Sequence, residues 1–112
     1  MVSSDYTPER GDIVWINFNP QLGHEQKGRR PALVISHKAY NEKVGLAVFC
    51  PITSKPKGYT FEVEVQLNSV KGAVLSDQIK NLDWKSLGLA FIEKIDSSSL
   101  SDVLERINVL IN

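Results

Sequence analysis

The sequence offers few side chains that could bind a metal ion or form a disulfide. Its 112 residues include one cysteine, Cys50, and two histidines, His24 and His37, and none of them has a spacing typical of metal ligands. A structural zinc site is therefore excluded, and we expect neither a metal site nor a cofactor. The sequence also lacks a glycine-rich phosphate loop and a Gly-x-Ser-x-Gly turn, which excludes the common nucleotide hydrolases and serine hydrolases.

Neither charge nor hydrophobicity is in excess. The 13 basic residues balance the 13 acidic ones, so the chain has no overall positive field that would attract nucleic acid nonspecifically. The apolar runs at residues 32–35 and 46–49 are far shorter than the roughly 20 residues of a membrane span. The first residues lack the basic start and apolar stretch of a secretory signal. We expect a cytoplasmic protein with a single domain, residues 1–112.

The pattern of apolar residues predicts a mainly β chain. We expect strands at residues 12–19, 31–36, 46–53, 61–67, 73–76 and 89–95, one helical turn at 38–43, and a strand or bend at 77–82. Pro51, inside the third strand, predicts a bulge or an exposed edge. From residue 100 to 111 the apolar period becomes helical, and Asp96 or Ser97 can cap this helix. The expected fold is mainly β with a C-terminal helix (α+β), a small, strongly bent β-barrel with the helix packed across it and with Trp15 and Trp84 in the core.

One loop concentrates the polar chemistry of the chain. Residues 21–30 contain an imidazole, a carboxylate and three cations, which are His24, Glu25, Lys27, Arg29 and Arg30. The planar fork of Arg matches phosphate oxygens and Glu or His can move protons, so this set could bind and polarise a phosphodiester without a metal. The alternative interpretation is a solvated hairpin loop of mixed charge, which is common at protein surfaces.

Other residues also have two interpretations each. Thr53 is either a β-favouring strand end or a catalytic hydroxyl. Asp77 is either a turn residue or an acceptor for the edge of a base, and Phe18 borders the charged loop. Lys55 and Lys57 follow the strand at 46–53, so a local basic groove remains open on a chain without net charge.

The order of several short motifs resembles the MazF/PemK family of toxin endoribonucleases, over nearly the whole chain. The matching segments are Gly-Asp-Ile-Val-Trp at 11–15, Gly-His-Glu-Gln at 23–26, Arg-Pro at 30–31, Pro-Ile-Thr-Ser at 51–54, Lys-Gly-Tyr at 57–59, Asp-Gln-Ile-Lys at 77–80 and Ile-Asn-Val-Leu-Ile at 107–111. The Lys-Gly-Tyr and Asp-Gln-Ile-Lys segments favour the MazF branch.

This resemblance implies a fold, an activity and partners. The fold is the SH3-like small barrel of plasmid-maintenance toxins, and the activity is that of an mRNA interferase, which cleaves single-stranded RNA at short motifs without a metal. The implied partners are an antitoxin protein and a second copy of the chain in a homodimer. The implied products are a 2′,3′-cyclic phosphate and a 5′-hydroxyl.

The resemblance also assigns residues. Its catalytic positions fall on Glu25, Arg30 and Thr53, with Glu25 or His24 left open as the general base. The expected RNA-binding residues are Phe18, His24, Lys57, Asp77 and Gln78. One position departs from the PemK branch, which places an Arg two positions before the Asp of its Asp-Gln pair. Here that position is Leu75, so the PemK catalytic scheme does not transfer whole.

Two other classes compete with this interpretation. A non-enzymatic toxin of the same fold would bind and poison a protein target such as DNA gyrase. Gyrase poisons of the CcdB type end in a functional Trp-Gly-Ile, whereas this sequence ends in Val-Leu-Ile-Asn. An inert SH3-like interaction module is the third class. RNA cleavage in excess chelator distinguishes all three.

Overall fold

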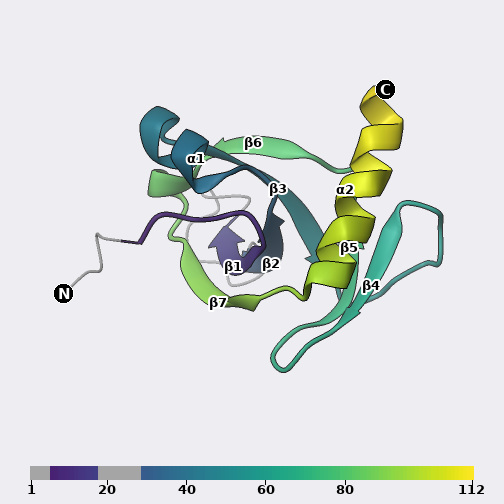
Figure 1. The fold of residues 1–112 in the computed structure, drawn as a ribbon. Helices are drawn as coiled ribbons and strands as arrows, with labels where there is room; N and C mark the ends of the chain where they lie inside the picture. Colours follow the sequence, from purple (N-terminus) through teal and green to yellow (C-terminus); the bar gives the residue numbers. More distant parts are fainter. Residues whose placement is uncertain (1–5, 18–28) are drawn as a thin grey trace.

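The computed structural model describes residues 6–17 and 29–112, and it is a curled β-sheet with two helices (Figure 1). The strands are β1 Asp12–Asn17, β2 Arg29–Val34, β3 Leu46–Thr53, β4 Glu62–Gln66, β5 Lys71–Leu75, β6 Lys80–Asp83 and β7 Ala90–Lys94. The helices are α1 Lys38–Val44 and α2 Ser97–Ile111, with a short 3-10 turn at Trp84–Ser86. The predicted mainly β fold with a C-terminal helix is confirmed.

The antiparallel strands run in the order β4-β5-β3-β2-β1-β7, and β6 pairs with β3 off this path. On one side β3 pairs with β2. On its other side β3 changes partner, because residues 46–49 pair with β6 and residues 52–53 pair with β5. This change of partner divides the strands into two sheets that share β3, and it bends the structure into a half-barrel.

Pro51 lies at this change of partner, and the prediction of a bulge or an exposed edge there was wrong. Pro51 is buried and pairs with Ala32 of β2 in regular register. Backbone groups alternate along a strand, and the Val48 carbonyl accepts from the Ile35 amide on the β2 side, so the Pro51 nitrogen faces the opposite side. There it falls between the last residue paired with β6 and the first paired with β5, where no ladder donor is needed.

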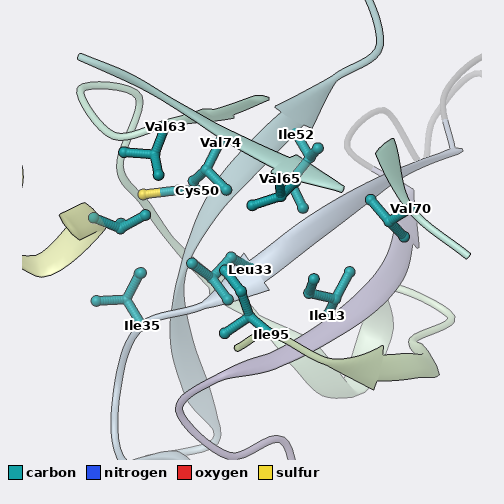
Figure 2. Packing of buried hydrophobic residues seen from close by; sticks show 11 residues of the cluster. Ile13, Leu33, Ile35, Cys50, Ile52, Val63, Val65, Val70, Val74 and Ile95 are labelled. Carbon is teal, nitrogen blue, oxygen red and sulfur yellow. The ribbon is translucent and has the colours of Figure 1, made fainter. Parts of the chain in front are cut away.

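Two apolar clusters cover opposite faces of the sheet. Figure 2 shows the first, the helix-side core, in which side chains such as Ile13, Leu33, Cys50, Val63 and Val74 converge from five strands. Helix α2 packs against this core through Leu100, Val103, Leu104 and Ile107. The second, the opposite-face core, is built from Val14, Ile16, Ala32, Val34, Ala47, Phe49 and Leu87. Because successive side chains of a strand point to opposite faces, β1 and β2 contribute residues to both cores.

The two tryptophans differ in their surroundings. Trp84 packs against the opposite-face core, and its indole N–H donates to the Asn41 carbonyl at 2.9 Å. Trp15 is 39% exposed, so its predicted place in the core was wrong. It lies near the end of β1 opposite Pro31, where the guanidinium of Arg29 lies over its ring at 5.7 Å from the centroid. The contact with the Arg29 cation on one face of the ring therefore takes the place of burial of Trp15 in the core.

Helix α2 begins at a side-chain cap. The Asp96 carboxylate accepts from the Ser99 amide at 2.9 Å, and this hydrogen bond lowers the pKa of Asp96 below its ordinary value. Among the described residues, no helix has the length and apolar character needed to cross a membrane.

Replacing Asp96 should weaken the docking of α2. We expect Asp96→Ala to lower the free energy of unfolding by about 1 kcal/mol at pH 7, because a first-turn amide loses its acceptor, whereas Asp96→Asn keeps the cap. Since the folded-state pKa is the lower one, the charged cap contributes fully at neutral pH and its contribution is lost as pH falls through that value. Urea unfolding of the three proteins at pH 7 and pH 3 measures both effects. Equal stability of Asp96→Ala and the native chain at pH 7 would contradict the assignment.

Candidate active site

The register of β2 and β3 brings together two residues that the sequence separates widely. The pairs Val34–Phe49, Leu33–Cys50 and Ala32–Pro51 are in register, and two further steps along the same register set Arg30 opposite Thr53. Alternation places both side chains on the face of Ala32 and Pro51. Side chains directly opposite each other on antiparallel strands have Cβ atoms about 5 Å apart. Two predicted catalytic residues therefore share one site.

Arg30 and Thr53 lie at the centre of an open groove with two halves of about 450 Å³ each. Both halves share Arg30, Ile52 and Thr53. We call the half toward β6 the amide half, and it adds Pro51, Leu75, Gln78, Lys80 and Leu82. We call the other the lysine half, and it adds Arg29, Pro31, Ser54, Lys55 and Lys71.

The groove is cationic although the chain is neutral. Its described lining residues include five cations, Arg29, Arg30, Lys55, Lys71 and Lys80, and no carboxylate. The local basic groove that the sequence left open is therefore present. Lys71 and Lys80 were missed because each reaches the groove through pairing of its strand with β3, and no local pattern in the sequence encodes that pairing.

The hydroxyl of Thr53 is oriented by a turn. Its Oγ1 accepts from the Lys55 amide at 3.1 Å, directly after β3 ends. A hydroxyl that accepts one hydrogen bond still has its own proton to donate. Thr53 can therefore donate to an anionic oxygen in the groove, while the exposed guanidinium of Arg30 supplies charge on the same face.

Close backbone contact between β5 and β3 fixes the position of Thr53. A Cβ on Gly72 would lie 2.1 Å from the Thr53 carbonyl oxygen and 3.0 Å from its carbonyl carbon. Only glycine allows β5 to approach β3 this closely. The glycine thus helps to hold the strand end that carries the hydroxyl.

A hydrogen-bonded turn borders the amide half. The Gln78 amide donates to the Leu75 carbonyl at 3.1 Å, and the Asp77 carboxylate accepts from the Tyr59 hydroxyl at 2.7 Å. That bond to Asp77 is the main reason why the pKa of Tyr59 is raised, and a hydrogen bond from Gln78 acts in the opposite direction. Asp77 is thus a turn residue whose carboxylate engages Tyr59, and Gln78 lies in the groove wall.

Lys57 lies away from this centre. Lys57 belongs to the loop between β3 and β4, where its backbone amide and that of Gly58 donate to the Glu62 carboxylate, and it does not line the groove described above. Phe18, His24 and Glu25 lie outside the described residues.

Other chemistries find little support in the described part of the chain. Residues 6–17 and 29–112 contain no group of three or more His, Cys, Asp or Glu side chains that could hold a metal ion. Cys50 is fully buried in the helix-side core. Burial, together with the charge of Asp77, raises the pKa of its thiol to about 12, so Cys50 is not a nucleophile at neutral pH.

Comparisons with known proteins agree with this geometry. The family model described as PemK-like, MazF-like toxin of type II toxin-antitoxin system matches residues 9–111. The chain belongs to this family. It is 39% identical over 108 residues to the endoribonuclease toxin MazF of Escherichia coli strain K12, covering 96% of this chain and 97% of that protein.

Solved structures extend the match. MazF from Deinococcus radiodurans superposes with a TM-score of 0.86 at 45% identity, covering 96% of this chain and 98% of the other. A MazE-MazF structure from the same organism has a TM-score of 0.85 at 40% identity and covers 96% and 97%. The predicted fold type and the predicted closeness to the MazF branch are both confirmed.

Substitution of Gly72 should disturb Thr53 more than the rest of the fold. We expect Gly72→Ala to lower the free energy of unfolding by about 2 kcal/mol or more, because the new methyl group meets backbone that cannot rotate away. Gly88→Ala is the matched control, since it also replaces a glycine at positive φ but meets nothing within 4 Å, and it should cost about 1 kcal/mol. Urea unfolding compares them. A cost for Gly72→Ala no greater than for the control would show that β3 and β5 separate freely.

Proposed function

We propose that this chain is a sequence-specific, metal-independent endoribonuclease that cleaves single-stranded RNA as the toxin of a type II toxin-antitoxin system. The observation that carries the proposal is the cationic groove with Arg30 and Thr53 on one face at its centre. Family membership and the endoribonuclease relative support it. A gyrase poison of the same fold has no comparable support.

Arg30 and Thr53 suit the charge that develops in such a reaction. The ribose 2′-oxygen bonds to the adjacent phosphorus and the bond from phosphorus to the 5′-oxygen breaks, which gives a 2′,3′-cyclic phosphate and a 5′-hydroxyl. Negative charge accumulates on the nonbridging oxygens between these events. We assign Arg30 as the charge stabiliser, because its fork can donate two parallel hydrogen bonds, and Thr53 as a hydroxyl donor to a nonbridging oxygen.

Proton transfer requires groups with a suitable pKa. Arg is protonated at any pH that proteins tolerate, so Arg30 does not serve as the base. We assign Glu25 to remove the proton from the 2′-hydroxyl, with His24 as the alternative base, and a proton must return to the 5′-oxygen. These two assignments rest on the sequence, which places both residues a few positions before Arg30.

The contacts that select the RNA sequence are assigned to the rim of the groove. Gln78 lines the amide half, and Asp77 adjoins it, which supports their assignment to contacts with a bound base. Lys57 and, from the sequence, Phe18 and His24 complete the proposed RNA-binding set. The PemK scheme uses an Arg where this chain has Leu75, which instead forms apolar wall in the amide half.

The proposed partners follow from the family. The Deinococcus MazE-MazF structure supports an antitoxin as the partner of this chain, and the cationic groove can attract an acidic antitoxin segment by the charges that hold RNA phosphates. We further assign a homodimer in the cytoplasm, where messenger RNA is available.

RNA cleavage should persist in excess EDTA, because the proposed chemistry uses an arginine, a hydroxyl and proton-transfer side chains. The measurement is gel analysis of a mixed-sequence single-stranded RNA incubated with purified protein, with and without EDTA. Loss of cleavage in EDTA and its recovery on addition of Mg²⁺ or Mn²⁺ would refute the mechanism.

Arg30→Ala should reduce the cleavage rate by about a hundredfold or more, the usual effect of removing one preorganised donor to a developing oxyanion. Arg30→Lys should restore little, because a point charge does not reproduce the planar fork. Arg10→Lys is the control, since Arg10 bonds to the Ile35 carbonyl away from the groove. Circular dichroism checks the fold of each variant. A near-native rate for Arg30→Lys would assign Arg30 a purely electrostatic role.

A further inference from the structure

The two halves of the groove have different chemistry although they meet at the same pair of residues. The lysine half carries Arg29, Arg30, Lys55 and Lys71 on a short stretch of surface. The amide half has two cations, Arg30 and Lys80, and its remaining wall is largely aliphatic. A nucleotide has the same two parts, a phosphate that seeks cations and a flat base that seeks apolar walls with a few polar contacts.

The lysine half is suited to phosphates. Lys71 lies on the same face as Ala73, which pairs with Thr53, so its ammonium group extends the positive charge of Arg30 along β5. Lys55 follows Thr53 in the chain, and its backbone amide already holds the Thr53 hydroxyl. Flexible lysines around an open surface attract phosphate without distinguishing bases.

The amide half is suited to a base. Pro51, Leu75 and Leu82 give apolar walls, and Gln78 is the uncharged polar side chain that this half has in addition to the shared Thr53. The primary amide of Gln78 carries N–H donors beside a carbonyl oxygen, which form an adjacent donor and acceptor. Such a pair matches the edge of a base that presents the complementary pattern, as in the pairing of Gln with adenine.

We propose that the two halves divide the recognition of RNA: the amide half holds one base next to the scissile phosphate and Gln78 reads its edge, while Lys55 and Lys71 bind phosphates on the other side. The inference rests on the proposed function and adds to it two phosphate-binding lysines and a base pocket. Tyr59 is a positioning residue in this arrangement, because its hydroxyl joins Asp77 at 2.7 Å and orients the turn that carries Gln78.

Binding of four 2′-O-methyl homopolymers, of A, C, G and U, tests this division without cleavage, because methylation removes the attacking hydroxyl. Lys71→Gln and Lys55→Gln should weaken all four strands by similar factors, and each should reduce the slope of log affinity against log salt by about 0.7, the value for one phosphate contact in a single strand. Lys38→Gln, at an exposed lysine that begins α1 away from the groove, should change neither quantity.

Gln78→Leu should leave the salt slope intact and reduce the preference for the best strand over the others by about fivefold or more, the usual value of one paired base contact. Tyr59→Phe should reduce that preference in part, with an unchanged salt slope. The proposal is overturned if Gln78→Leu keeps the order and ratios of the four affinities, if Lys71→Gln changes those ratios at constant slope, or if no strand binds. Failure of the native chain to cleave unmodified RNA while it still binds these strands would reject the endoribonuclease assignment and leave the division of the groove standing.

Discussion

The change of partner along β3 is the constraint on which the rest of the structure depends. One eight-residue strand pairs with β2 through its middle, with β6 over its first half and with β5 at its end. Proline is tolerated in the middle of this strand because the point where the partners change requires no donor. The same change curls the sheet, so the faces of β5 and β6 turn toward the end of β2. The groove is the concave result, and its central residues come from the two strands that stay paired across the bend.

Much of the fold could be predicted from the sequence because the patterns that mark strands, helices and caps are local. Alternation identified β4 and a period change identified α2. Asp96 or Ser97 was expected to cap that helix, and Asp96 does so. The errors at Pro51 and Trp15 share a cause. Each residue was judged by its own chemistry, and its environment is set by a distant segment: β5 and β6 for the proline, and Arg29 for the tryptophan. The type of a residue can be read from the sequence, but the distant segment that will contact it cannot.

The candidate site shows the same limit. Arg30 and Thr53 were identified from motifs, yet their meeting depends on a register between strands that lie about twenty positions apart in the chain. Lys71 had no motif to mark it, and Lys80 closes the Asp-Gln-Ile-Lys segment but was given no role, because a lysine at a strand start is most often a solvated surface residue. Their importance arises only when both strands are docked on β3. The net charge of the chain could therefore be predicted from the sequence, but the gathering of cations around the groove could not.

Concentrating cations on one face of a neutral chain has a physical consequence for binding. A uniformly basic protein would attract any polyanion over its whole surface, whereas here the acidic side chains elsewhere cancel the field beyond roughly one Debye length. Attraction is therefore short-ranged and confined to strands that enter the groove. Leu75 sharpens this effect, because an arginine there would add a further cation to the apolar wall beside Gln78. With leucine the lysine half carries four cations and the amide half two, counting Arg30 in both, so positive charge is concentrated on the side of Lys55 and Lys71.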